Sequence, residues 1–337
     1  MRILMTNGRI GSLTGTEIYV LELAVEWVRR GHVVAVLARE VGPLGRWLAD
    51  RGVPVVSDIA ALPWMPDVIH GQHNLPTMIA LGAAPDAPAI YVAHGAGLQE
   101  EQPPVHPRIR RYVGVAERMR YWLRERTGVD DAQIEIVPNA VDLERFTTVR
   151  RPEAAPRRAL LFANAATDRS PWVEAVAEAC AGAGLALDRS GLGFRQPTAT
   201  PETLLPDYDL VFATGRSAIE ALACGAAVIA VNDARCGPIV GAGNLASYRE
   251  INFTPPHDAP VTAPAAVAAA IGSWNATDAA SVTATVRAEM SLAAACDRIE
   301  AIYAAVAYEW EQGARPSLAE ETQAFARFLQ ALRRRPG

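Results

Sequence analysis

The sequence predicts an α/β protein built of two Rossmann-like, doubly wound domains. Short apolar runs alternate with segments of helical period through most of the chain, which is typical of a parallel sheet covered by helices on both faces. The alternation is interrupted by a polar, proline-rich stretch at 147–158 and then restarts. The chain has 337 residues, 50% of them hydrophobic, which is more than one domain usually holds.

The first half contains the more regular elements. Its first helix, at 17–31, has apolar residues at helical spacing, arginines near its C-terminal end and Gly31 to stop it. Further helices are expected at 45–52 and 117–128. The expected strands, in chain order, are 2–6, 32–38, 53–57, 67–72, 89–95, 112–116 and 134–142.

The second half repeats the pattern after the stretch at 147–158, which is interpreted as an interdomain linker. Its expected strands are 159–165, 185–190, 208–215 and 226–231, and its expected helices are 171–184, 217–225, 265–274, 288–310 and 318–335. Ligands of such sheets bind at the carboxyl ends of the strands, so we expect the ligand in a cleft between the two domains.

The composition excludes several classes of function. All 32 basic residues are arginine, so Schiff-base catalysis and a P-loop lysine are impossible. The net charge of −5 provides no basic field for nucleic acid or anionic lipid. The four cysteines are far apart and form no CxxC pair, which is typical of reduced thiols. No signal peptide and no bilayer-length apolar run is present, so the sequence favours a cytoplasmic protein with a small partner.

Residues 212–220, FATGRSAIE, predict an anion-binding helix start. Gly215 lets the backbone approach a ligand, Ser217 opens the helix, and the first N–H groups are left for a negatively charged partner. Arg216 supplies positive charge, and Glu220 accepts hydrogen bonds from a sugar hydroxyl. An ordinary turn with a serine cap explains the same residues equally well.

Several segments resemble motifs of glycosyltransferase family 4, in the order in which that family has them. EALACGAAVIA at 220–230 is similar to the family's EAMACGxPVI run. The N-terminal half contains TGTEIYVLELAVEWVRRGHVVAV, DVIHGQH, YVAHG, VGVAERMRYWL and IEIVPNAVDLERF. These look like the family's glycine-rich opening, its DVVHxH and TxHG strands, and its VSExxRxxL and IxVIPNGVDxxRF segments. The matches cover most of residues 1–305.

The resemblance implies the GT-B fold, in which two Rossmann-like domains face a central cleft and a C-terminal helix crosses back to the first. It implies an acceptor-binding domain at 1–150, a nucleotide-sugar-binding domain at 151–305, and helices at 306–337 that pack on the first domain. The implied reaction moves a sugar from a nucleotide sugar to an acceptor hydroxyl with retention of configuration, and needs neither cofactor nor metal. The acceptor is expected to be a glycan, a lipid-linked sugar or a small molecule.

The same resemblance assigns roles to individual residues. The implied catalytic residues are His94, Arg169 and Glu220. The expected donor-binding residues are Gly15, Thr16, Asn164, Arg195, Gly215, Arg216, Ser217 and Ala218. Acceptor or hinge contacts are expected at Glu17, His73, Asn139 and Asp142.

Two departures from the family pattern concern the donor site. The first of the family's two glutamates is Phe212 here, and the arginine that usually grips the diphosphate aligns with Asn164. Arg216 is expected to compensate for the missing charge. These departures leave two other functions open. One is a sugar-nucleotide hydrolase or epimerase of the same fold, and the other is a glycosyltransferase-like binding or scaffold protein without catalysis.

Three further patterns resemble a metal site or a dinucleotide site, but each is better explained without a metal ion or a dinucleotide. His70 and His73 have metal-ligand spacing, but no cysteine or acid completes a set. The DYD sequence at 207–209 resembles a metal-binding DxD, yet it directly precedes an apolar strand and reads as structural. The glycines at 8–15 follow GxxGxxxG, which is not the GxGxxG of a dinucleotide site.

The terminal arginines at 333–335, together with Arg108, Arg110 and Arg111, allow at most a weak peripheral contact with a membrane. A solvated helix face is the favoured interpretation of this charge cluster.

Overall fold

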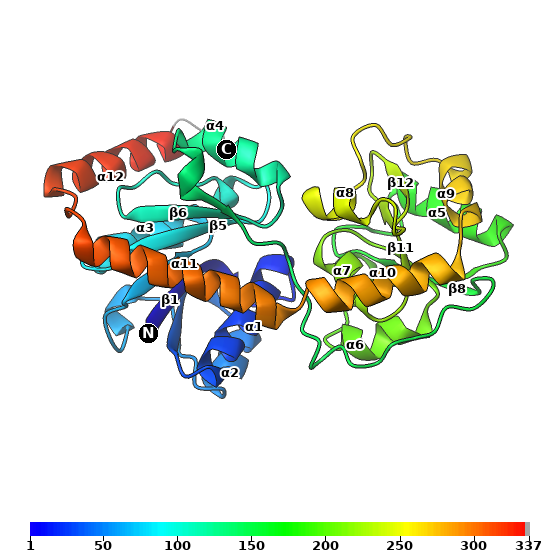
Figure 1. Cartoon of the computed structure of the whole chain (residues 1–337), viewed down its shortest axis with the longest axis horizontal. Helices are drawn as coiled ribbons and strands as arrows, with labels where there is room; N and C mark the ends of the chain where they lie inside the picture. The colour runs from blue at the N-terminus through cyan, green and yellow to red at the C-terminus, as the bar shows by residue number, and fades with distance from the viewer. Residues whose placement is uncertain (334–337) are drawn as a thin grey trace. The chain divides into compact units, whose positions relative to one another are not determined.

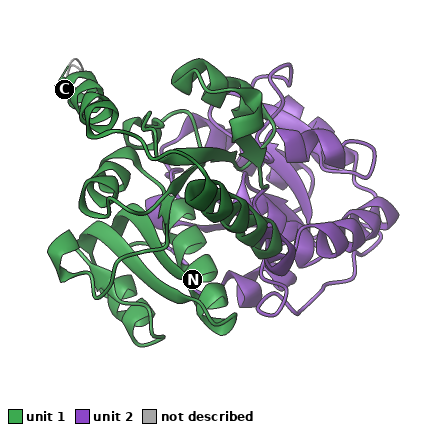
Figure 2. Ribbon diagram, turned by 60° about the vertical axis from the view of Figure 1, so that its left-hand side comes forward, with its two compact units in different colours: residues 1–137, 296–337 green, residues 138–295 purple. Residues whose placement is uncertain are grey.

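The structure, a computed structural model, describes residues 1–333, which form two compact units. Unit 1 contains residues 1–137 and the C-terminal segment from Cys296, and unit 2 contains residues 138–295 (Figure 2). The chain returns to unit 1 through α11 (Leu292–Gln312) and α12 (Leu318–Arg333), at the orange and red end of the colour scale in Figure 1. The C-terminal helices therefore rejoin the first domain, as the sequence predicts.

Unit 1 is built on a seven-stranded sheet of order β3-β2-β1-β4-β5-β6-β7, in which all neighbouring strands are parallel. The strands are β1 (Arg2–Ile10), β2 (Val33–Val41), β3 (Val55–Val56), β4 (Val68–Gly71), β5 (Ala89–Ala93), β6 (Ile109–Gly114) and β7 (Ile134–Ile136). The first three strands extend the sheet one way, and β4 starts the other way. The loops after β1 and β4 therefore flank the point where the chain order reverses, which is where doubly wound sheets open a crevice.

The remaining helices of unit 1 are α1 (Gly15–Arg29), α2 (Pro43–Ala49), α3 (Asn74–Ala83) and α4 (Arg118–Thr127), with single 3₁₀ turns at Ile59–Ala61, Gln99–Glu101 and Asp131–Gln133. The helical period of α1 buries Leu23 and Trp27 against the sheet, at 1% and 0% exposure. No helix was expected at the position of α3. Its sequence, NLPTMIALGA, is short, has a proline at its third position and contains no charged residue to mark a solvent-facing side.

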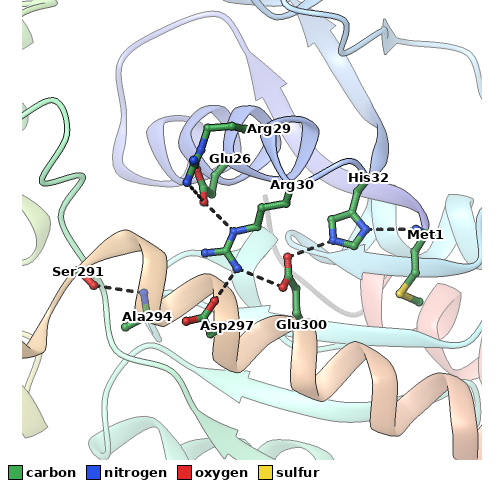
Figure 3. Close-up of polar contacts among 9 residues, drawn as sticks. All are labelled: Met1, Glu26, Arg29, Arg30, His32, Ser291, Ala294, Asp297 and Glu300. Carbon is green, nitrogen blue, oxygen red and sulfur yellow. Dashed lines mark hydrogen bonds and ion pairs between the residues drawn. The ribbon is translucent and has the colours of Figure 1, made fainter.

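A charged network fixes the C-terminal end of α1 against α11 (Figure 3). The Arg30 guanidinium lies 2.6 Å from Asp297 and 3.1 Å from Glu300, and its Nε lies 2.7 Å from Glu26. Nε2 of His32 lies 3.1 Å from Glu300 as well. The returning segment is thus bound to the helix that begins at the loop after β1.

Unit 2 has a five-stranded sheet of order β12-β11-β10-β8-β9. The strands are β8 (Arg158–Phe162), β9 (Ala186–Ser190), β10 (Leu210–Phe212), β11 (Ala227–Val231) and β12 (Cys236–Ile239). Only β12 is antiparallel to its neighbour. After β9 the chain passes to the other side of β8, so the order reverses between β8 and β10. The predicted α/β class with two doubly wound domains is confirmed.

Apolar cores cover both faces of the unit 2 sheet. Alternate residues of β10 point to opposite faces, so that Val211 belongs to one core and Leu210 and Phe212 to the other. The covering helices are α5 (Pro171–Gly182), α6 (Pro201–Leu204), α7 (Arg216–Ala223), α8 (Leu245–Glu250), α9 (Pro264–Gly272) and α10 (Ala276–Glu289), and 3₁₀ turns occur at Leu192–Phe194 and Leu205–Asp207.

The boundary between the units lies after Val137, and not after residue 150 as the sequence suggested. Phe146 is fully buried in a unit 2 core. The backbone N–H of Arg150 donates to the carbonyl of Cys224 at 2.8 Å, and its guanidinium pairs with Asp209. The stretch at 147–158 therefore packs along unit 2 and is not an interdomain linker. Sequence polarity concealed these backbone contacts.

The second boundary also differs, because unit 1 resumes at Cys296 instead of residue 306. The helix expected at 288–310 is interrupted between α10 and α11. Val141 donates to the carbonyl of Met290 at 2.9 Å and accepts from the N–H of Leu292 at 2.8 Å. This short bridge to Ser291 replaces helical hydrogen bonds, and the apolar pattern alone could not reveal it.

Candidate functional site

In unit 1, a hydrogen bond connects the two segments that flank the reversal of strand order, namely the end of β1 and the loop after β4. The backbone N–H of Gly8, near the end of β1, donates to Nδ1 of His73 at 2.8 Å. His73 has a φ of 54°, a strained value for a residue with a side chain. Burial lowers the pKa of His73, although the nearby Glu100 opposes the shift. The neutral ring that accepts at Nδ1 carries its proton on Nε2, for which no partner occurs among the described residues.

His94, the predicted catalytic histidine, follows β5 beside the same crevice. Its Nε2 lies 2.6 Å from Oε1 of Gln72, and its ring meets the ring of Tyr19 edge-on at 4.6 Å. Gln72 is fully buried, and its backbone is held by Thr6 at 3.0 Å. The imidazole is thus fixed from β4 and from α1. Gln72 was missed because an amide at a strand end has no distinctive sequence signal.

The Glu17 carboxylate is hydrogen-bonded to residues of the adjacent loop after β1. Its carboxylate accepts from the N–H groups of Gly11 and Ser12 at 2.9 and 3.0 Å and from the Thr14 hydroxyl at 2.6 Å. Burial would raise the pKa of Glu17, but these hydrogen bonds together lower the pKa. The side chain predicted to contact the acceptor or act as a hinge therefore shapes the loop after β1. Gly15, by contrast, has open space where a side chain would stand.

Glu101 is an ionisable residue of unit 1 that the sequence did not single out. It lies in the short turn after β5, and its Oε2 is 2.8 Å from the position a Cβ on Gly95 would take. Burial, reinforced by the negative charge of Glu100, raises its pKa to about 7. A carboxyl group that titrates near neutral pH is thus placed next to the residue that follows His94. The acidic pair in HGAGLQEE, directly after a buried strand, was the available signal.

The crevice of unit 2 lies between β8 and β10, and the loops after β8 and β9 support it. Asn164 accepts from the N–H of Leu192 through Oδ1 at 3.2 Å and from the N–H of Gly193 through its carbonyl at 3.0 Å. A Cβ on Gly193 would stand 1.9 Å from the carbonyl oxygen of Ala166, so only glycine allows this contact. Asn164 therefore braces the two loops in addition to any role with a ligand.

The two arginines predicted in these loops are both exposed. Arg169 directly precedes Ser170, the N-cap of α5, and Arg195 follows the 3₁₀ turn with a φ of 58°. Next to them is a pocket of about 390 Å³ lined by Asp168, Leu187, Asp188, Arg189, Phe194 and Gln196. The pocket wall combines a phenylalanine, an amide and charged side chains. Its position next to Arg195 is where the sequence predicts the nucleotide base.

The helix start in FATGRSAIE differs in detail from the expected cap. The strand ends at Phe212, Gly215 is the N-cap with a φ of 60°, and Ser217 lies inside the first turn. Arg216 and Glu220 face each other one turn apart, with Nη2 and Oε1 3.4 Å apart. The N–H of Ala218 donates to the Gly215 carbonyl at 3.2 Å, which makes it the first hydrogen bond within the turn that begins α7.

Asn139 and Asn252 form a polar contact beside this helix start. Nδ2 of Asn139 donates to Oδ1 of Asn252 at 2.9 Å, and Nδ2 of Asn252 lies 3.7 Å from the position of a Cβ on Gly215. Asn252 and Phe253 both have left-handed backbones, with φ of 54° and 52°. The predicted hinge residue Asn139 therefore belongs to the surroundings of α7. Asn252 had no sequence signal, because only the fold brings it here.

Three other predicted features have structural roles. Phe212 is fully buried in the sheet core, so no side chain from this position reaches the loops. Asp209 accepts the N–H groups of Arg157 and Arg158 at 2.9 Å each, which agrees with the structural interpretation of DYD. Asp142 accepts the N–H of Glu144 at 3.0 Å, as a turn residue does.

Three of the arginines considered for membrane contact are engaged inside unit 1, whereas Arg333 is exposed. Arg108 is 1% exposed and donates to backbone carbonyls, and Arg110 and Arg111 approach Glu309. Arg334 and Arg335 lie outside the described residues. No helix within 1–333 combines the length and apolar character needed to cross a lipid bilayer.

Two Rossmann-like units of this topology define the GT-B class of glycosyltransferase folds, and solved structures agree. A glycosyltransferase from Rickettsia africae ESF-5 has a TM-score of 0.63 and 13% identity, over 90% of this chain and 98% of its own. HepE from Anabaena, solved in complex with UDP and glucose, has a TM-score of 0.64 and 16% identity, over 90% of this chain and 100% of its own.

The sequence comparison agrees over part of the chain. The model of Glycosyltransferase Family 4 matches residues 59–145, a span that includes DVIHGQH, YVAHG and all of IEIVPNAVDLERF except its last residue. The resemblance to family 4 is thereby confirmed for this span. No curated protein gave a significant sequence match to the chain.

Proposed function

We propose that the protein is a glycosyltransferase that moves a sugar from a nucleotide sugar to an acceptor hydroxyl, with retention of configuration. One observation carries the proposal. The loops after β8 and β10 flank the reversal of strand order in unit 2, and they hold Arg169 and the start of α7 at one edge of the sheet. This is the position at which doubly wound sheets bind nucleotides.

The donor site follows from the charges at that edge. Arg169, Arg216 and the positive N-terminal end of the α7 dipole would stabilise the negative charge that develops on the leaving diphosphate. Asn164 would contribute an uncharged donor. Arg195 and the neighbouring pocket would receive the base, and Glu220, oriented by Arg216, would accept hydrogen bonds from donor hydroxyls.

Unit 1 would hold the acceptor. His94 is fixed by Gln72 and Tyr19 and would face the reacting centre, with His73 contacting the acceptor. Gly15 and Thr16, at the start of α1, would approach the donor. Asn139 and Asp142 would form the hinge after Val137. We further propose a cytoplasmic location, supported by four cysteines that are buried free thiols.

The first experiment is a thermal-shift panel of UDP, GDP, ADP and dTDP with their common sugar conjugates. UDP comes first because HepE was solved with it. A ligand at 100 times its dissociation constant stabilises the folded protein by about 2.7 kcal/mol, so one nucleotide should raise the melting temperature clearly.

The Arg169→Ala and Glu220→Ala variants should bind the sugar conjugate of this nucleotide about tenfold more weakly, since each substitution removes a charged contact. The matched control is the exposed Arg151→Ala. Unchanged affinity in both site variants would refute the site.

Turnover separates the remaining functions. Transfer that requires an acceptor and continues in EDTA supports the proposed metal-independent transferase. Free sugar or an epimer formed without acceptor would indicate a hydrolase or epimerase. The buried Phe212, where the family has a glutamate, specifically favours the non-catalytic alternative. Nucleotide binding with no turnover of any donor would establish that alternative.

A further inference from the structure

A second pocket, of about 460 Å³, lies in unit 1, and none of the predicted donor residues lines it. The loop after β5 forms one wall with Gln102, Pro103 and Pro104, and α12 forms the other with Phe328. Its volume is within the range of small-molecule sites.

The pocket is rigidly built. Nδ2 of Asn74 donates to the carbonyls of Gln99 and Gln102 at 2.8 and 3.2 Å. The Tyr112 hydroxyl donates to the carbonyl of Pro104 at 2.8 Å. These bonds and the two adjacent prolines fix the loop, so a ligand would meet a preformed wall.

The opposite wall is equally fixed, because α12 is docked on unit 1. Arg108 donates to Oε2 of Glu321 at 3.1 Å, and the ring of Phe325 meets His106 edge-on at 5.2 Å. Phe325 also lies 3.4 Å from the position of a Cβ on Gly82. The pocket exists only because the C-terminal helix returns to unit 1.

Two cations line a largely apolar surface. Arg126 of α4 and Arg327 of α12 are both exposed, and within residues 1–333 neither guanidinium has an ion pair or hydrogen bond. The remaining wall is provided mainly by proline, valine, phenylalanine and leucine side chains. An apolar surface with two uncompensated positive charges is complementary to an amphiphile with an anionic group.

The pocket adjoins one proposed acceptor residue, because its wall residue Asn74 directly follows His73. Gln102, on the other side of the pocket, directly follows the buried Glu101. We propose that this pocket binds a monomeric amphiphilic anion, an apolar chain or ring with one phosphate or carboxylate, as the acceptor or part of it. The role as acceptor rests on the proposed glycosyl transfer, whereas the binding itself does not.

Calorimetric titration of the full chain with octyl phosphate, kept below its micelle concentration, tests the binding. We expect the Arg126→Gln/Arg327→Gln double variant to raise the dissociation constant about tenfold, from two partly exposed ion pairs. Leu332→Glu, which puts a negative charge at the pocket wall, should weaken binding as well. Arg124→Gln is the matched control on α4, because this arginine stacks over Tyr121 and does not line the pocket.

Two further probes separate the contribution of the anionic group to binding from that of the apolar chain. Octyl glucoside or inorganic phosphate that binds as tightly as octyl phosphate would overturn the proposal, as would equal affinity in the double variant. Binding only to vesicles that contain anionic lipid would overturn it too, since it would indicate a surface contact. Stabilisation by the nucleotide panel is measured on the same variants. A chain that binds a nucleotide of the panel but not octyl phosphate refutes the pocket and leaves the transferase intact, and a chain that binds octyl phosphate but none of the panel's nucleotides or conjugates refutes only the transferase.

Discussion

The backbone N–H of Gly8 donates to Nδ1 of His73 at 2.8 Å, and this bond joins the two strands between which the order of unit 1 reverses. It connects Gly8, near the end of β1, with the second residue after β4. The bond leaves no space at Gly8, and it orients a histidine that we place in the acceptor site. The geometry of the crevice therefore depends on a glycine whose importance no motif indicates.

Replacing Gly8 by alanine should disturb this contact. A Cβ there would stand 2.7 Å from Nδ1 of His73, so we expect a loss of about 1–3 kcal/mol in the free energy of unfolding. Urea denaturation measures it. Gly15→Ala, at the first residue of α1, is the matched control, because nothing lies within 4 Å of its Cβ position. Equal stability of wild type and Gly8→Ala would show that His73 moves aside freely.

Glu321→Gln should loosen α12. The substitution removes the charge that faces Arg108, whose guanidinium is buried and whose pKa burial lowers. We expect a cost of about 1–3 kcal/mol, as for a buried group that loses a charged partner. Hydrogen exchange along 318–333 and the thermal midpoint measure it. The exposed Glu311→Gln serves as control, and identical exchange in both variants would contradict the anchoring role of Glu321.

His70 should make the protein less stable in acid. Burial lowers its pKa to about 3 from the ordinary 6.5, so the folded chain binds fewer protons than the unfolded chain between these values. Its contribution to stability is complete above pH 6.5 and falls by about 1.4 kcal/mol per pH unit as the pH drops towards 3. Denaturation of wild type and His70→Gln across this pH range isolates the contribution of His70 to the free energy of unfolding. Parallel pH profiles of the two proteins would exclude it.

Glu101 should make the protein less stable as the pH rises, which is opposite to the effect of His70. Burial and Glu100 raise its pKa to about 7, so the folded chain holds a proton that the unfolded chain has already lost above pH 4.5. Stability from this group is present at low pH and is lost as the pH rises through 7. Glu101→Gln should therefore gain stability over wild type at pH 8 compared with pH 5. Matched urea midpoints at the two pH values provide the measurement, and a gain that does not change with pH would contradict the shift.

Much of the fold could be predicted because its elements have strong local patterns. The alternation of apolar strands and helices placed β1, α1, β4 and β5 at their observed positions. It failed for α3, which contains no charged residue to mark a solvent-facing side, and at Ser291, where a bridge to Val141 interrupts an apolar helical run. Local periodicity contains no information on such long-range backbone pairs.

The residues of the candidate site likewise fall into those that a local motif predicts and those that only the fold brings together. Motifs pointed to His94, Arg169, Gly215 and Glu220 because strand ends and glycine turns have sequence signatures. Gln72 and Asn252 had none, and Glu101 had only the acidic pair that follows a buried strand. Gln72 reaches His94 from a neighbouring strand, and Asn252 reaches Asn139 across 113 sequence positions.

The sequence by itself determined the two-domain α/β architecture, the resemblance to family 4 and the absence of lysine chemistry, because composition and hydrophobic period are properties of short segments. Only the tertiary structure decided where the units divide, that Glu17 serves its own loop, and that α12 completes a pocket with Arg126 and Arg327. Each of these depends on which distant groups come within hydrogen-bond or van der Waals distance. That distance is set by the packing of whole elements, and no local stretch of the chain encodes it.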